Sequence, residues 1–273
     1  MIKIGCCLNM NAKTGSKIGD ESIPLFAKLG FDYIELPLAQ VMDLGNNEFN
    51  ELLCVIRNEG IAAEACNNFF PARVRLTGED AKLENILEYA RAAIDRAAAM
   101  GAGIIVLGSS AAKNIPAGFP RDKARDQLKE LLPHLDVLVK PFGITITLEP
   151  LNSKESNFIV TAAEALSLAR ELYLDNVKIL IDYYHLRMEN ENPSVILDAG
   201  PDLRHLHIAC KDGRFFPKPD DGENYAEFFS SLKQINYNGM MSVEGYSNDL
   251  ASEGAVSLEL LRSYQSAARD THF

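Results

Sequence analysis

Four ionisable side chains stand at or near the ends of four successive hydrophobic segments in the second half of the chain. They are Glu149, Asp182, His207 and Glu244. A divalent metal ion needs several oxygen and nitrogen donors that converge to about 2.0–2.3 Å from it. Three carboxylates and one imidazole suit Mn²⁺, Co²⁺ or Mg²⁺ better than a thiolate-rich set would. The pattern therefore predicts one divalent metal site, built from residues that are far apart in the sequence.

Two of the five histidines, His205 and His207, are separated by a single residue in the stretch LRHLHIACKDGR. Side chains alternate between the two faces of a β-strand, so both imidazoles lie on one face if this stretch is a strand. His207 is nearer the carboxyl end of the stretch, which favours it as the metal ligand. We expect His205 to be a buried structural histidine that donates a hydrogen bond to a carbonyl group.

Short hydrophobic segments alternate with longer helix-like segments along the whole chain, which is typical of βα units around a parallel sheet. The eight predicted strands are residues 2–9, 32–38, 61–67, 104–110, 144–150, 177–184, 203–209 and 239–245. The eight predicted helices are residues 21–30, 48–60, 82–101, 121–143, 161–173, 193–200, 225–239 and 252–269. Several helices are predicted to end at a left-handed glycine, namely Gly30, Gly60, Gly101 and Gly143. No linker interrupts this order, so we predict a single α/β domain, a (β/α)₈ TIM barrel over residues 1–273.

In such barrels the catalytic groups lie at the carboxyl ends of the strands, where the βα loops converge. The second and third predicted strands end near Glu35 and Asn67. Asn67 is a candidate for binding substrate. A glutamate in the position of Glu35 more often packs or pairs than takes part in catalysis, so we rank it below the other acids.

The composition is that of an ordinary globular protein, with 47% hydrophobic and 24% charged residues. The net charge of −11 argues against a nucleic-acid partner, because phosphate backbones are bound by clustered Lys and Arg. No hydrophobic run is long enough to cross a bilayer, and the first residues read as a strand rather than a signal peptide. We therefore predict a cytoplasmic protein with no membrane partner, whose five cysteines are reduced thiols.

Several stretches together resemble the motifs of a known family. LEPLNSKESNF, LIDYYHL, HLHIACKDGR and SVEGY look like the strand motifs of the xylose-isomerase-like TIM barrels, in the D-tagatose (D-psicose) 3-epimerase branch of sugar isomerases and epimerases. Two earlier stretches, FDYIELPL and EACNNFFPARVRLTGED, are similar to the second and third βα segments of that group. The similarity therefore spans nearly the whole chain.

The resemblance implies that the four strand-end residues hold one ion, Mn²⁺ by preference, and that Glu149 and Glu244 are also the catalytic acid and base. It places His185 and Glu155 against the substrate. Glu155 would either orient His185 or cap the helix that begins near Thr161. The resemblance also implies a homo-oligomer, a dimer or a tetramer.

The chain departs from the family pattern in three places, one of which is the stretch KDGRFFPKPDDGENY, where the more usual Pro-Gly-x-Gly form is absent. Ser153 stands where an arginine is usual. The substrate-binding arginine that follows the metal histidine is shifted, because Gly213 occupies its expected place and Arg214 comes one residue later. Arg214 would contact a sugar oxygen or remain a solvated loop charge. These departures concern the identity of the sugar and leave the metal residues unchanged.

The predicted reaction begins with removal of a proton from the carbon beside a ketone. A bound metal would polarise the carbonyl as a Lewis acid and stabilise the enediolate. Glu149 and Glu244 come from different strands, so one would take the proton from one face of a keto-sugar and the other would return a proton to the opposite face. That outcome is epimerisation, whereas return of the proton to the neighbouring carbon would be aldose–ketose isomerisation.

Three alternatives stand beside this interpretation. The same metal and base would serve a lyase or dehydratase acting on a keto-sugar, a keto-inositol or a 3-keto-glycoside. A non-catalytic sugar-binding or complex-forming subunit would retain the barrel without needing both glutamates. A DNA-repair nuclease of the endonuclease IV type is disfavoured, because it needs histidines from earlier strands and this chain has none before His134.

Overall fold

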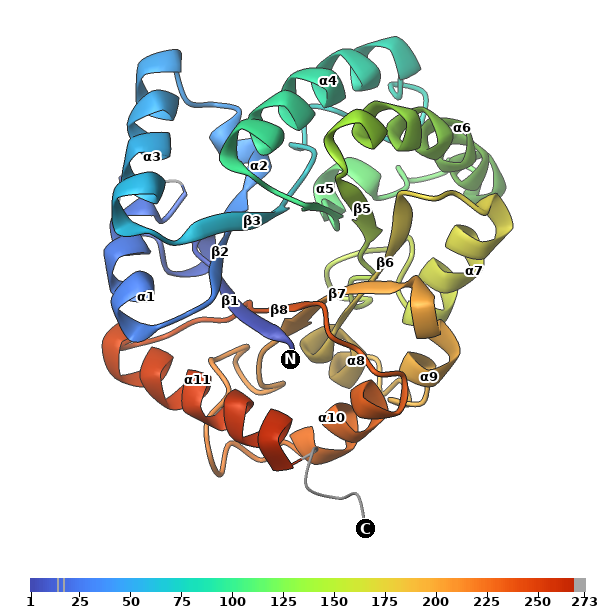
Figure 1. Cartoon of the computed structure of the whole chain (residues 1–273). Helices are drawn as coiled ribbons and strands as arrows, with labels where there is room; N and C mark the ends of the chain where they lie inside the picture. The colour runs from blue at the N-terminus through green and yellow to red at the C-terminus, as the bar shows by residue number, and fades with distance from the viewer. Residues whose placement is uncertain (14, 17, 268–273) are drawn as a thin grey trace.

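The computed structural model describes residues 1–13, 15–16 and 18–267, and these form a closed barrel of parallel strands with helices around it (Figure 1). The strands are β1 (Lys3–Cys7), β2 (Tyr33–Pro37), β3 (Ala62–Asn67), β4 (Ile104–Leu107), β5 (Thr145–Leu148), β6 (Val177–Asp182), β7 (Leu203–Ile208) and β8 (Met240–Val243). Neighbouring strands pair in chain order, and β8 pairs with β1 to close the barrel. The predicted TIM barrel is confirmed.

The helices lie outside this ring of strands, as Figure 1 shows. They are α1 (Ile23–Leu29), α2 (Leu38–Val41), α3 (Asn46–Glu59), α4 (Leu83–Met100), α5 (Ser110–Lys113), α6 (Arg121–Val139), α7 (Ala162–Leu172), α8 (Tyr183–Met188), α9 (Val195–Ala199), α10 (Tyr225–Gln234) and α11 (Leu250–Ala267). The long helices α4 and α6 each bury an apolar face against the barrel, which forms the main core. Among the described residues, no helix is both long and apolar enough to cross a membrane.

The predicted element boundaries differ from the structure mainly after the strands. Three short helices, α2, α5 and α8, begin directly or within a few residues after β2, β4 and β6 and were not predicted. The predicted strand 177–184 ends at Asp182, because the Asp182 side chain accepts a hydrogen bond from the Tyr184 backbone N–H (2.9 Å) and caps α8. The predicted helix 252–269 corresponds to α11, and residues 268–269 lie outside the described residues. The predicted glycine caps Gly30, Gly60 and Gly101 are confirmed at the ends of α1, α3 and α4, with φ between 66° and 90°. Gly143 is also left-handed, but it caps the short 3-10 helix Lys140–Phe142 that follows the end of α6 at Val139.

The inside of the barrel is filled in layers, because side chains alternate along each strand. Tyr33 and Leu180 belong to a small buried apolar cluster that is separate from the main core. Two residues later on the same strands come Glu35 and Asp182, which are also buried. The barrel thus presents a layer of ionisable side chains next to an apolar layer, towards the carboxyl ends of the strands.

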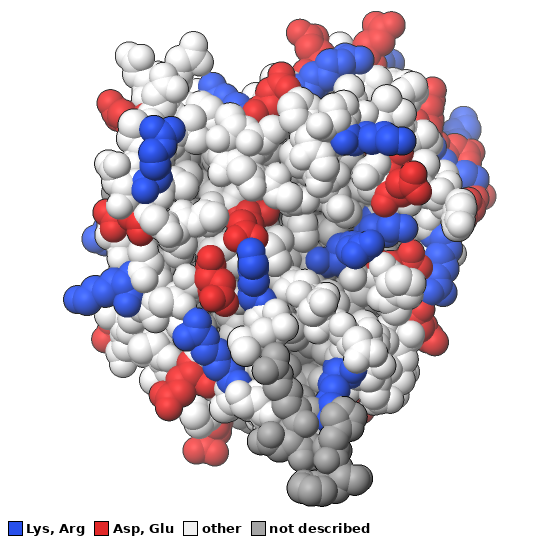
Figure 2. Space-filling view, in the orientation of Figure 1, with Lys and Arg blue, Asp and Glu red and all other residues white. Residues whose placement is uncertain are grey.

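Charge on the surface is mixed. On the face shown in Figure 2, Lys and Arg side chains are interspersed with Asp and Glu side chains rather than gathered in one basic surface. The excess of acidic residues in the sequence is therefore not segregated on this face.

Gly5 is required by the close approach of the Tyr33 ring inside the barrel. A Cβ atom on Gly5 would lie against three Tyr33 ring atoms, well inside van der Waals distance, and Tyr33 is held in place by its hydrogen bond with Ser242 (2.7 Å). We expect Gly5→Ala to lower the free energy of unfolding by about 1–3 kcal/mol through overpacking. Gly103→Ala is the matched control, because its nearest neighbour is 4.0 Å away. Denaturant unfolding of both variants measures the difference, and equal stabilities would contradict this packing argument.

Candidate active site

Four buried ligand-type side chains converge at the carboxyl ends of β5 to β8. They are Glu149, Asp182, His207 and Glu244, and one donor atom from each lies within 4.8 Å of the others. Glu149 directly follows β5 and Glu244 directly follows β8, while Asp182 ends β6 and His207 lies in β7. The structure therefore brings together the four residues that the sequence predicted as metal ligands.

His207 lies at the centre of this group. Its Nδ1 atom is 3.1 Å from Glu149 Oε1 and 3.3 Å from Glu244 Oε2, and its Nε2 atom faces the opposite way, 3.0 Å from Glu35 Oε1. Burial by itself lowers the pKa of His207, but the charges of Glu35 and Glu244 outweigh it and raise that pKa well above its usual value. Either a proton on Nδ1 or a cation bound beside Nδ1 would balance the negative charge of these carboxylates.

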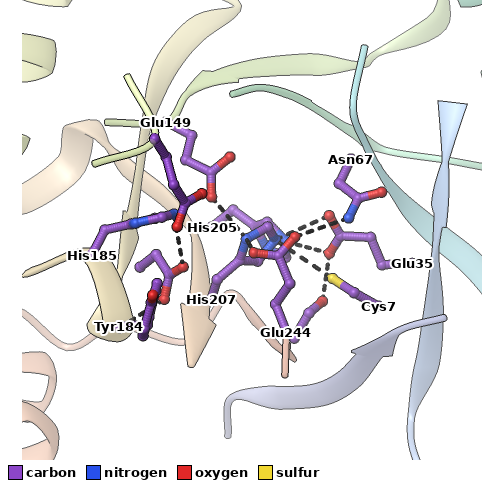
Figure 3. A network of polar contacts seen from close by, with 12 residues as sticks. Cys7, Glu35, Asn67, Glu149, Tyr184, His185, His205, His207 and Glu244 are labelled. Carbon is purple, nitrogen blue, oxygen red and sulfur yellow. Dashed lines mark hydrogen bonds and ion pairs between the residues drawn. The ribbon is translucent and has the colours of Figure 1, made fainter. Parts of the chain in front are cut away.

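Glu35 contacts the Nε2 atoms of both histidines of β7 (Figure 3). Its two carboxylate oxygens meet His205 Nε2 (2.8 Å) and His207 Nε2 (3.0 Å), and it also accepts a hydrogen bond from Ser242 Oγ (2.5 Å). Burial raises the pKa of Glu35, but the charges and hydrogen bonds of the two histidines outweigh it and hold that pKa well below its usual value. His205 is the structural residue that the sequence predicted, although its partner is a carboxylate rather than a carbonyl. Glu35 pairs, as expected for its position.

The support from Glu35 determines which nitrogen of His207 is available. An imidazole that donates Nε2–H to a carboxylate presents the lone pair of Nδ1 on its other side once that nitrogen loses its proton. Nδ1 is the atom that faces Glu149 and Glu244. Cys7 also lies near Nε2, at 3.9 Å, but burial and then the charge of Glu35 raise the pKa of its thiol, which keeps it neutral. The donor set on the Nδ1 side fits a hard divalent cation.

Arg214 reaches into the site despite its shifted place in the sequence. Its guanidinium donates to Glu244 Oε2, lies 3.5 Å from Asp182 Oδ2, and stacks 4.6 Å from the centre of the Tyr184 ring. Its partner at the outer edge is Glu155, whose Oε2 is also 3.5 Å away. Of the two roles that the sequence left open, the solvated loop charge is excluded by this position.

The three carboxylates respond differently to this environment. Burial raises the pKa of Asp182 to about 7, against the opposing charge of Arg214. Burial also raises the pKa of Glu149, whereas the charges of His207 and Arg214 overcome burial at Glu244 and lower its pKa. The site therefore holds more acid groups than the surrounding cations fully stabilise, and a bound divalent cation would favour the ionised form of all three.

Two neighbours fix the glutamates at the ends of β5 and β8. Asn67 Nδ2 donates to Glu244 Oε1 (3.0 Å). On the other side, the fully buried Lys113 donates from Nζ to the backbone carbonyl of Glu149 (2.7 Å), and burial lowers the pKa of Lys113 to about 8. Gly108 leaves the space that the Glu149 carboxylate fills, since a Cβ there would collide with it. The sequence predicted Asn67 as a site residue but gave no signal for Lys113, which lies in the unpredicted helix α5.

His185 and Glu155 are linked through Asn152, a residue that the sequence does not single out. Asn152 Nδ2 lies 2.9 Å from Glu155 Oε1 and 2.8 Å from His185 Nδ1. Glu155 therefore contacts His185 indirectly, and it does not cap α7, because Thr161 performs that role with its own side chain. Asn152 is part of the stretch LEPLNSKESNF, which resembles a family motif but does not by itself give this residue a role.

The buried charge of Glu35 is expected to stabilise the fold. Glu35→Gln should lower the free energy of unfolding at pH 7 by about 3 kcal/mol, because both histidines lose a charged acceptor. A lowered pKa means that this contribution is present above the unfolded pKa and is lost as the pH falls. The difference from wild type should therefore shrink below the ordinary glutamate pKa of 4.5. Denaturant unfolding across pH, with Glu64→Gln at the exposed Lys3 ion pair as control, measures it. A difference that grows towards low pH would contradict the assignment.

Comparison with known proteins places this chain in a family. Residues 23–264 match the family model of the xylose isomerase-like TIM barrel. A D-psicose 3-epimerase of Agrobacterium fabrum is 27% identical over 229 residues, which cover 81% of this chain and 76% of the relative. A 3-dehydro-D-guloside 4-epimerase of Escherichia coli is 26% identical over 231 residues, covering 82% and 86%. A solved D-allulose 3-epimerase of Methylomonas, in complex with D-allulose, superimposes with a TM-score of 0.83 at 22% identity, covering 96% of this chain and 97% of that one. The predicted resemblance is confirmed: this chain belongs to the xylose isomerase-like TIM barrel family.

Proposed function

We propose that the protein is a metal-dependent sugar epimerase that removes a proton from the carbon beside the ketone of a keto-sugar. The observation that supports this most directly is that Glu149 and Glu244, which follow β5 and β8, both approach Nδ1 of His207 beside Asp182. A binding protein needs polar contacts to a sugar but does not need two buried glutamates that face the same point. Epimerisation needs such a pair, because a proton leaves one face of the carbon and another arrives on the opposite face.

The relatives indicate the substrate class. Their names describe reactions at carbon 3 of a ketose or at carbon 4 of a 3-dehydro sugar. In both cases the reacting carbon is next to a carbonyl carbon, so one kind of proton abstraction accounts for both names. We infer the same chemistry for this chain, with Mn²⁺ as the preferred ion and Co²⁺ or Mg²⁺ as alternatives.

Glu149, Asp182, His207 and Glu244 would hold the cation, which when bound would polarise the carbonyl and offset the negative charge of the enediolate. Glu149 and Glu244 would also transfer the protons, one as the base and the other as the acid. The roles would exchange in the reverse reaction.

Three further residues would orient the sugar. Arg214 brings a positive charge and N–H donors to the edge of the carboxylate cluster. His185 is buried beside Asp182, with its Nε2 atom 3.5 Å from Oδ2. Asn67 holds Glu244 in place and lies at the end of β3, where a sugar hydroxyl would also reach its amide.

Metal binding is testable without a substrate. Adding Mn²⁺ at about 100 times its dissociation constant should raise the free energy of unfolding by about 2.7 kcal/mol, since the ion binds only the folded protein. Asp182→Asn should abolish most of this gain by removing one charged ligand. Asp202→Asn is the control, because Asp202 pairs with Arg170 and Lys178 away from the cluster. Calorimetric titration of metal-free protein measures the affinity directly. Equal Mn²⁺ affinities for wild type and Asp182→Asn would refute the ligand assignment.

Proton chemistry is testable before the natural sugar is known. Mn²⁺-loaded protein in ²H₂O should introduce deuterium beside the carbonyl of at least one free ketose or keto-glycoside, as seen by NMR. Glu149→Gln and Glu244→Gln should each reduce the exchange rate by at least about 10²-fold, because each removes a group that transfers a proton. Glu171→Gln, in the exposed pairs with Arg125 and Lys129, should leave the rate unchanged.

The product separates the alternatives. An epimer or an isomer would identify the proposed class, whereas an unsaturated product would identify a lyase that uses the same base. If metal-loaded protein binds these sugars with equal affinity in wild type and both glutamine variants and none shows exchange, the protein is a sugar-binding subunit and the proposal fails.

A further inference from the structure

The imidazole of His185 receives two hydrogen bonds on one nitrogen. The backbone N–H of Asn152 points at Nδ1 from 3.2 Å, and the side-chain Nδ2 of the same residue lies 2.8 Å from Nδ1. A backbone N–H can only donate a hydrogen bond. Nδ1 must therefore accept, and it carries no proton in this arrangement.

The side-chain amide of Asn152 is held in one orientation. Its Nδ2 atom also donates to Glu155 Oε1 (2.9 Å), and its Oδ1 atom accepts a hydrogen bond from the Lys154 backbone N–H (3.1 Å). Exchanging the oxygen and nitrogen of the amide would place an oxygen against the Glu155 carboxylate and a nitrogen against a backbone donor. Both contacts would be repulsive, so the amide presents N–H groups to His185 and Glu155 together.

The opposite nitrogen of His185 faces the candidate active site. Nε2 is buried and has no hydrogen-bond partner among the described residues, while Asp182 Oδ2 lies 3.5 Å from it. A neutral imidazole with an unprotonated Nδ1 carries its proton on Nε2. His185 therefore directs an unused N–H group towards the carboxylate cluster.

We propose that Asn152, oriented by Glu155, is a positioning residue that fixes His185 as the neutral Nε2–H tautomer and so makes it a hydrogen-bond donor to the sugar oxygen that gains negative charge. This inference rests on the proposed function for the identity of the acceptor. The tautomer itself rests only on the contacts of Asn152. If Nε2 of His185 were unprotonated, its lone pair would repel that sugar oxygen and would compete for the cation.

The two site histidines thus receive opposite assignments from the groups behind them. Glu35 accepts from Nε2 of His207, which leaves the lone pair of Nδ1 for the ligand position. Asn152 donates to Nδ1 of His185, which leaves a proton on Nε2. When the nitrogen away from the site donates to an acceptor, the nitrogen that faces the site has a lone pair and can bind a metal. When the nitrogen away from the site accepts from a donor, the nitrogen that faces the site carries the proton and can donate a hydrogen bond.

The tautomer is measured by long-range ¹H–¹⁵N NMR of the Mg²⁺-loaded full chain with ¹⁵N-labelled histidine, because protonated and unprotonated ring nitrogens have well separated shifts. His185→Gln assigns the signals. Wild type should show an unprotonated Nδ1 and a protonated Nε2 for His185. In Asn152→Asp, the new carboxylate accepts instead of donating and competes with the remaining backbone N–H, so the protonated fraction of Nδ1 should rise. Asn157→Asp adds the same charge to the same loop, where its side chain contacts Ile115, and should leave His185 unchanged.

A second readout separates positioning from stability. Asn152→Asp should reduce kcat for deuterium exchange by about 10²-fold with a smaller change in KM, because the donor acts mainly on charge that develops during reaction. Asn157→Asp should keep the wild-type rate. A protonated Nδ1 in wild type, or an unchanged His185 spectrum in Asn152→Asp, would overturn the inference. So would a normal kcat in Asn152→Asp with an altered tautomer. Absence of exchange in wild type, with the expected tautomer present, would refute the proposed function and leave the tautomer assignment standing.

Discussion

The concentration of carboxylates inside one end of the barrel is the constraint on which the rest of the site depends. Glu35, Glu149, Asp182 and Glu244 are all buried. Like charges in a low dielectric repel strongly, and each loses its hydration shell. The protein answers with imidazoles and a guanidinium placed between the acids, and a divalent cation would complete the balance. The closed ring of strands is what holds these groups together, since each comes from a different strand.

The supporting groups are as informative as the groups that face the centre. An imidazole is chemically ambiguous, because either nitrogen can carry the proton. Glu35 resolves this ambiguity for His207 and Asn152 resolves it for His185, in opposite directions. Two residues of one type thereby become suited to different tasks within one site. The Glu35 carboxylate and the Asn152 amide therefore contribute to the chemistry, although neither faces the proposed metal position.

The layered interior explains why the functional groups appear where they do. Each inward-facing position is followed, two residues later, by the next inward-facing position. The inner apolar cluster and the ionisable layer are therefore successive steps along the same strands. Short helices such as α5 and α8 begin immediately after this layer and bring Lys113 and His185 to it. The βα loops thus extend a site whose base is built into the barrel.

The sequence by itself determined the barrel, through the alternation of segments, and it singled out the four clustered residues because they stand at successive strand ends. Strand periodicity also predicted that His205 and His207 share a face. Other features depend on contacts between distant parts of the chain, such as Glu35 with His207, 172 residues apart. Local spacing carries no information about such pairs. The inward position of Arg214, the bond from Asn152 to His185 and the burial of Lys113 were decided only by tertiary structure, because closing the barrel sets which side chains meet.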